Sequence, residues 1–133
     1  MSAGDGLPGM NLAALAEGFE GSEDVLAQML GLFESQARQR LVELDEALAT
    51  GDTAAGRKTL HYMVNIAGAV RAFALAELAR RMGEALRSED ITAARALAAT
   101  LHAEAALVLR QVAHLLALHS ADPAALWTTA LPG

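Results

Sequence analysis

The stretch of residues 22–71 reads SEDVLAQMLGLFESQARQRLVELDEALATGDTAAGRKTLHYMVNIAGAVR. Apolar residues recur in it every three or four positions, which is typical of one face of an α-helix. The first stripe is Leu26, Met29, Leu30, Phe33, Ala37, Leu41, Leu44 and Leu48, and the second is Leu60, Met63, Ala67 and Val70. Gly51 and Asp52 form a tight break between the stripes, with Asp52 as the cap of the next helix. Two long amphipathic helices joined so closely are expected to pack as antiparallel neighbours.

The rest of the chain extends this pattern in both directions. Two further stripes are Leu75, Leu78, Ala79, Met82 and Leu86, and then Leu97, Ala98, Leu101, Ala105, Leu109, Val112 and Leu116. Residues 88–90 cap the last helix, which is expected to run to about His119, and a short helix is expected at residues 11–19. The sequence therefore predicts an all-α fold: an antiparallel up-and-down four-helix bundle with a short N-terminal helix.

Three segments are expected along the chain. Residues 1–9 contain three glycines and a proline and predict a flexible leader. Residues 10–119 form the bundle, and residues 120–133 form a C-terminal tail. Asp122 and Pro123 stand at cap and first-turn positions, so a short helix through Trp127 is expected in the tail. We expect Trp127 to pack on its own bundle rather than on a partner.

Composition narrows the classes of function. The length of 133 residues fits one domain, and 53% hydrophobic residues suffice for a core. The absence of cysteine excludes disulfides and thiolate metal sites and suits a cytoplasmic location. We expect no signal peptide and no membrane partner, because no uncharged apolar run reaches the ~18 residues of a membrane span. A net charge of −6 disfavours nucleic acid as a partner.

His61 is predicted to point into solvent. An α-helix advances about 100° per residue, which centres the second apolar stripe roughly 140° away from His61. The same arithmetic gathers Arg57, Val64, Asn65, Gly68 and Ala72 around the imidazole. Gly68 costs the helix about 1 kcal/mol relative to alanine, so it has a reason to be there: close approach of a partner, or helix–helix packing. A lone exposed histidine is itself most often an ordinary surface residue.

The run of residues 61–75, HYMVNIAGAVRAFAL, resembles the core motif of histidine-containing phosphotransfer (HPt) domains, His-x-Leu-Lys-Gly-x-Ala-Gly-x-x-Gly-Ala-x-x-Leu. The matching residues are His61, Ala67, Gly68, Ala72 and Leu75, with Met63 in place of leucine. Residues 24–33 and 44–52 are also similar to the family's acidic-leucine helix and its Ala-x-x-Gly-Asp turn. The resemblance covers roughly residues 10–117 and implies that His61 is the phosphoacceptor.

Three positions depart from the family motif: Val64 replaces the lysine, and Asn65 and Arg71 replace glycines. The family lysine helps to neutralise the phosphoryl group, which valine cannot do. Arg57 and Lys58 lie within one helical turn of His61 and are the candidates to supply that charge. Arg87 on the next helix is a weaker candidate. The alternative for each of these cations is a solvated surface charge.

The resemblance implies a phosphorelay intermediate of two-component signalling. His61 would accept a phosphoryl group from a receiver-domain aspartate, such as that of a hybrid sensor kinase, and pass it to the receiver of a response regulator. The implied partner surface is Val64, Asn65, Gly68 and Ala72. No cofactor is expected on this chain, because the receiver supplies Mg²⁺, and no kinase activity is expected without an ATP-binding loop. We expect a monomer.

Two other functions stay open from the sequence. One is a degenerate HPt-like adaptor that binds a receiver without carrying phosphate, which Val64 and Asn65 motivate. The other is a helical module that only mediates oligomerisation. A metal site is not expected, because neither His102 with Glu104 nor His114 with His119 has the spacing of two ligands on one helix face.

Overall fold

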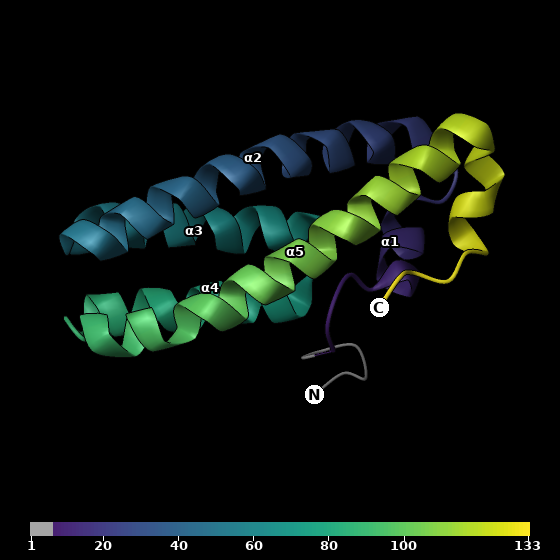
Figure 1. Ribbon diagram of the computed structural model, residues 1–133. Coiled ribbons are helices and arrows are strands. Elements are labelled where there is room, and N and C mark those ends of the chain that lie inside the picture. Colours follow the sequence, from purple (N-terminus) through teal and green to yellow (C-terminus); the bar gives the residue numbers. More distant parts are fainter. Residues whose placement is uncertain (1–6) are drawn as a thin grey trace.

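The computed structural model describes residues 7–133, which are helical with no strand in that range (Figure 1). The elements are α1 (Leu12–Phe19), α2 (Glu23–Thr50), α3 (Thr53–Ala69), α4 (Phe73–Arg87), α5 (Ile91–Ala121) and a 3-10 helix, η1 (Pro123–Trp127). The all-α prediction is confirmed. The predicted boundaries differ from these by two residues at the ends of α3 and α5.

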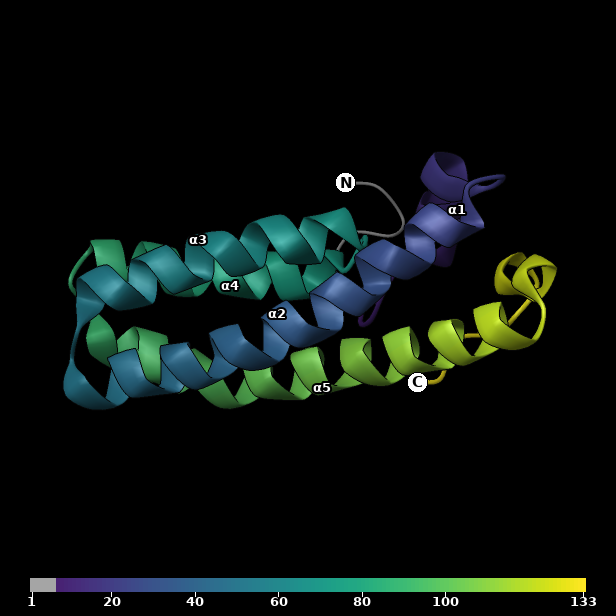
Figure 2. The same cartoon turned by 90° about the horizontal axis from the view of Figure 1, so that it is seen from above.

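The four longer helices lie side by side, and each contacts two others. Helix α3 packs against α2 and α4, and α5 packs against α4 and α2. Helix α1 contacts α2 and η1 at one end of the molecule (Figures 1 and 2). The short connections keep helices that are neighbours in sequence adjacent in space.

Local capping explains two of these connections. Gly51 ends α2 with a φ of 75°, a left-handed conformation that glycine adopts without strain. The Asp52 carboxylate then accepts a hydrogen bond of 3.0 Å from Ala55 N at the start of α3. Asp90 caps α5 in the same way, accepting from Ala93 N at 3.0 Å. Both caps satisfy backbone N–H groups that have no partner within the helix.

The predicted apolar stripes form the core. All four positions of the α3 stripe and four of the five in α4 are buried, with Leu78 packed partly buried against them. Helix α5 also buries Ala94, Val108 and Leu115, which widen its apolar face. By length and composition alone, α5 could cross a membrane, a test that core helices of bundles also pass. In this structure its buried face contacts α2 and α4.

Gln111 is a buried polar residue that ties both ends of the chain to α5. Its side-chain oxygen accepts a hydrogen bond of 2.7 Å from Met10 N, and its side-chain nitrogen donates one of 2.9 Å to the Pro132 carbonyl. Gly9 is also buried, and its N–H donates to the Glu104 carboxylate at 2.6 Å. Gly9 is therefore held against α5, in contrast to the flexible leader predicted for residues 1–9, and residues 1–6 lie outside the described part of the chain.

The C-terminal tail folds back on the bundle. The predicted short helix is η1, and Leu126 within it is buried. Trp127 packs against the core, and its indole N–H donates to the Glu23 carboxylate at 2.9 Å. This hydrogen bond is the main cause that lowers the pKa of Glu23. Trp127 thus packs on its own bundle, as predicted.

Gln111→Leu is expected to lower the free energy of unfolding by about 1–3 kcal/mol. The substitution leaves the Met10 N–H and the Pro132 carbonyl without partners, and burying an unpaired polar group costs that much unless the segment detaches into water. Chemical denaturation gives the stability, and hydrogen exchange at Met10 reports detachment. The matched control is Arg110→Leu, an exposed neighbour on the same helix, which should change stability by less than about 0.5 kcal/mol. Equal stability of the two variants would contradict a clamping role for Gln111.

Candidate functional site

His61 stands at the middle of α3 with its side chain exposed, as the apolar spacing predicted. Leu60 and Met63 beside it are only 1% exposed, so packing of the opposite helix face fixes the rotation of α3 about its axis. That rotation holds the imidazole away from the core. The position of His61 is therefore set by the hydrophobic packing of α3 rather than by any contact of the histidine.

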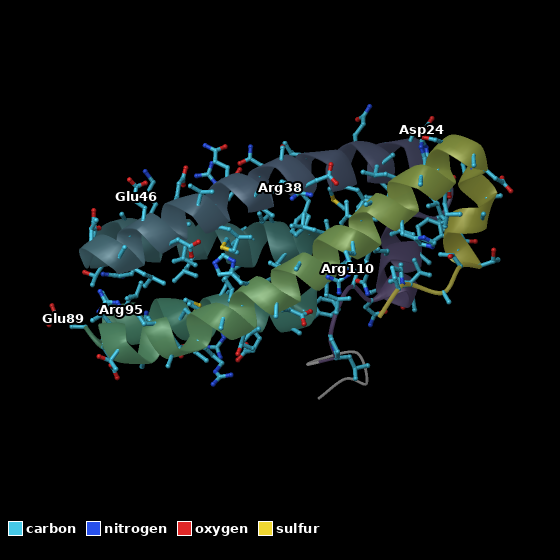
Figure 3. The ribbon with its side chains drawn as sticks, in the orientation of Figure 1. Asp24, Arg38, Glu46, Glu89, Arg95 and Arg110 are labelled. Carbon is cyan, nitrogen blue, oxygen red and sulfur yellow. The ribbon has the colours of Figure 1, made fainter. Side chains whose placement is uncertain are left out.

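Among residues 7–133 the His61 side chain has no hydrogen-bond partner, whereas each of the other three histidines has one. His102 bonds Asp45 at 2.7 Å, His114 bonds the Thr129 hydroxyl at 2.8 Å and His119 bonds Asp24 at 2.7 Å. Asp24, the partner of His119, lies at the end of α2 that is beside the C-terminal tail, whereas Glu46 lies near the other end of the same helix (Figure 3). Among residues 7–133 no hydrogen bond joins the His61 ring to another side chain, which leaves both its nitrogens available.

An open groove of about 540 Å³ runs beside His61 between α3 and α4. His61 and Val64 line it together with four cations and one carboxylate. The charged residues are Arg57, Lys58, Arg80, Arg87 and Glu84. The structure thus brings both cations predicted from the sequence, and Arg87 from the next helix, into one groove with the histidine. This α3–α4 groove is strongly positive on a chain of net negative charge.

Three of these cations have no counterion in the part of the chain that the structure describes. Arg80 pairs with Glu77 and Glu84 on its own helix, and its hydrogen bond lowers the pKa of Glu77. Within the described range, by contrast, Arg57, Lys58 and Arg87 form no ion pair, and all three are exposed. Their charge is therefore available to an anion that enters the α3–α4 groove.

One glycine that the sequence did not single out, Gly56, lets α3 and α4 pack closely beside this groove. A Cβ on buried Gly56 would lie 2.8 Å from Leu86 Cδ1, which is too close for two carbons. A Cβ on Gly83, which lines the groove itself, would make ordinary contact with Leu60 Cβ at 3.9 Å. The sequence could have indicated such a position, because a glycine inside an amphipathic helix lowers helix stability by about 1 kcal/mol relative to alanine.

Gly68, in contrast, has no packing role in this fold. A Cβ built on it would meet nothing within 4 Å outside the backbone of its own helix. Helix–helix packing among residues 7–133 therefore does not explain this glycine. Asn65 is exposed on the same face, while Val64 is half-buried and packs against the core, so Val64 presents less apolar surface than the sequence predicted.

The prediction that Ala72 belongs to the partner surface is wrong. Ala72 is completely buried, because α3 ends at Ala69 and the helical arithmetic no longer holds beyond it. Arg71 turns the chain with a φ of 59°, in the left-handed region where the family motif has glycine. Its guanidinium bonds the Ala69 carbonyl at 2.7 Å and lies 5.5 Å over the Phe19 ring, so Arg71 also links this turn to α1. The surface around His61 thus reduces to Val64, Asn65 and Gly68.

A second groove, of about 520 Å³, lies on the other side of α3, against α2. It contains three carboxylates and two cations, namely Glu43, Glu46, Asp52, Arg40 and Lys58. Tyr62 also lines it, with the Arg40 guanidinium 4.6 Å above the ring. The exposed face of α3 therefore has a cationic groove on one side and a groove of mixed charge on the other.

Gly68→Ala is expected to raise stability by about 1 kcal/mol, or about 3 °C in Tm, while weakening the binding of a partner to this face about tenfold. The added methyl has free space within the fold but crowds a docked partner, and overpacking costs about 1–3 kcal/mol. Thermal unfolding and titration with a receiver domain measure the two effects. Gly31→Ala on α2, also with nothing within 4 Å, is the control that should gain stability without losing affinity. Equal affinity of the two variants would count against a docking role for Gly68.

Among residues 7–133 no group of three side chains could hold a metal ion. Comparison with known proteins gives no assignment: the chain matches no family model, and no curated protein or solved structure matches it. Function is therefore inferred from His61 and the residues around it.

Proposed function

We propose that this protein is a phosphorelay intermediate of two-component signalling, with His61 as the phosphoacceptor. In this proposal the four long helices form an antiparallel up-and-down bundle of the HPt type, with α3 as the helix that presents the histidine. The observation that carries the proposal is an exposed imidazole without a side-chain partner in the described residues, beside a groove with three unpaired cations.

The reaction needs a neutral imidazole that can reach a phosphoryl group. The unprotonated ring nitrogen attacks the phosphorus of a receiver's aspartyl phosphate, a P–N bond forms, and the P–O bond to the aspartate breaks as the carboxylate leaves. The second receiver reverses these events, and its aspartate takes the phosphoryl group. The receivers hold Mg²⁺, so this chain supplies the nucleophile and needs no cofactor.

Lys58 and Arg57 are the residues we assign to charge neutralisation. They lie three and four residues before His61, on the same side of α3, and both line the α3–α4 groove with the imidazole. A charge-assisted hydrogen bond to a phosphoryl oxygen contributes about 1.5–3 kcal/mol. These cations would take over part of the role of the family lysine, which is Val64 here.

The partners in this proposal are a hybrid sensor kinase and the receiver domain of a response regulator. They would dock over His61 on Val64, Asn65 and Gly68, where the missing side chain of Gly68 leaves room for a partner backbone. The same proposal places the protein in the cytoplasm as a monomer, with neither nucleic acid nor a membrane as its target.

The second candidate is an adaptor that binds a receiver without carrying phosphate. Val64 and Asn65 favour it, because both replace residues that the HPt motif uses next to the phosphoryl group. Incubation with a radiolabelled phosphorylated receiver separates the two candidates. A relay takes up label that is acid-labile and alkali-stable, as phosphohistidine is, whereas an adaptor binds the receiver and stays unlabelled.

A further inference from the structure

The positive charge of the α3–α4 groove extends well beyond the atoms that a phosphoryl group on His61 would touch. Arg87 is the last residue of α4 and is exposed. Its neighbour Leu86 packs against Gly56, which is five residues before His61 and thus about 7.5 Å away along the axis of α3. The groove therefore holds Arg87 at a distance from the histidine, where it faces a docked protein rather than the transferred group.

The opposite groove has a different charge. The α3–α4 groove has four cations and one carboxylate, and the groove against α2 has two cations and three carboxylates. Lys58 belongs to both, so it does not distinguish the two sides, whereas Arg87 belongs to one. A partner that lies across α3 thus meets positive charge on its α4 side and a slight negative excess on its α2 side.

Charge asymmetry of this kind sets the orientation in which two proteins meet. Complementary potentials steer the encounter and suppress wrong alignments. They therefore change the association rate more than they change the affinity of the final complex. Arginine is well suited to this role, because its planar guanidinium can bind a carboxylate through two parallel hydrogen bonds. Arg87 is exposed and has no counterion within residues 7–133, so its guanidinium is available to a carboxylate of a partner.

We propose that the α3–α4 groove binds a carboxylate-bearing segment of the receiver domain, and that Arg87 fixes the direction in which the receiver docks on α3. The inference rests on the proposed function, since it names how the partner of that same site is recognised. Its occupant follows from charge complementarity: Arg57, Lys58 and Arg87, which form no ion pair among residues 7–133, select an acidic segment.

Arg87→Glu is the test, and Arg81→Glu is its matched control. Both residues are exposed on α4 and both variants change the charge by the same amount, but Arg81 does not line the groove. The probes are receiver domains encoded in the same genome, with association rates measured at low and high salt. We expect Arg87→Glu to lower the association rate at least tenfold at low salt and to reduce its salt dependence. Arg81→Glu should stay within twofold of the unaltered protein.

Phosphoramidate, a small donor that phosphorylates histidine without a receiver, separates this inference from the proposed function. Label on His61 of the unaltered protein, located by peptide mapping, tests the nucleophile apart from docking, and thermal unfolding shows separately that Arg87→Glu is folded. Equal association rates for Arg87→Glu and Arg81→Glu, with His61 labelled normally, overturn the docking role of the groove alone. An unaltered protein that binds no receiver overturns both, and one that binds a receiver but takes up no phosphate overturns only the relay.

Discussion

His61→Gln is expected to abolish phosphoryl acceptance while leaving the fold unchanged. Glutamine keeps a polar side chain of moderate length but has no nucleophilic ring nitrogen, so no P–N bond can form. The His61 side chain is exposed and forms no side-chain hydrogen bond among residues 7–133. Substitutions at such positions change stability by less than about 0.5 kcal/mol. Labelling by a phosphorylated receiver measures phosphoryl acceptance, and thermal unfolding measures the stability of the fold.

His102→Gln is the matched control for this experiment. His102 is also a histidine on a long helix, but it bonds Asp45 on α2 and does not line either groove beside α3. This variant should be labelled like the unaltered protein. Histidine label that persists in His61→Gln would remove His61 from the proposed role. A fall of many degrees in its Tm would contradict the exposed placement.

The elements of this fold could be predicted because their signals are local. The positions of Leu60, Met63 and Ala67 fix both the presence of α3 and its buried face, and therefore the exposure of His61. Asp52 and Asp90 were correct as caps, since a cap depends on residues three positions apart. Ser22 stands at the N-cap of α2, but its side chain makes no capping hydrogen bond.

Features that depend on tertiary contacts could not be predicted from local sequence patterns. Gln111 is one residue within an apolar stripe, and nothing local indicates that it bonds Met10 on one side and Pro132 on the other. The angular spacing of a helix does not apply to Ala72, because α3 ends at Ala69 and the chain turns at Arg71. The place of Arg87 in the groove depends on how α4 packs against α3, which periodicity does not specify.

Val64→Lys is expected to raise the rate of phosphoryl transfer by about ten- to hundredfold. A residue three positions after His61 lies about 60° round the helix from it, and Val64 lines the same groove. A lysine ammonium there could donate a charge-assisted hydrogen bond to the phosphoryl group, and 1.5–3 kcal/mol of transition-state stabilisation corresponds to about that change in rate. The measurement is the single-turnover rate of transfer from a phosphorylated receiver at saturating concentration, because at saturation a change in affinity does not alter this rate.

The half-buried position of Val64 makes an uncharged control necessary. Val64 packs against the core, so any substitution alters some packing as well as the charge. Val64→Met supplies a long, unbranched and neutral side chain, whereas the lysine stem can cover the same apolar surface and keep its ammonium in water. Stability of both variants should lie within about 1 kcal/mol of the unaltered protein. The rate gain should appear with lysine and not with methionine.

The outcome also decides where the charge comes from in the unaltered chain. A clear gain with Val64→Lys means that Lys58 and Arg57 compensate only in part for the missing lysine. Equal rates mean that these cations or the receiver already neutralise the phosphoryl group. Lys58→Gln separates the two cases: it should slow transfer in the unaltered protein where Lys58 supplies the charge, and leave the rate unchanged where the receiver does. If every variant binds the receiver and none takes up phosphate, the departures at Val64 and Asn65 are those of an adaptor, because a single restored cation cannot then be what the site lacks.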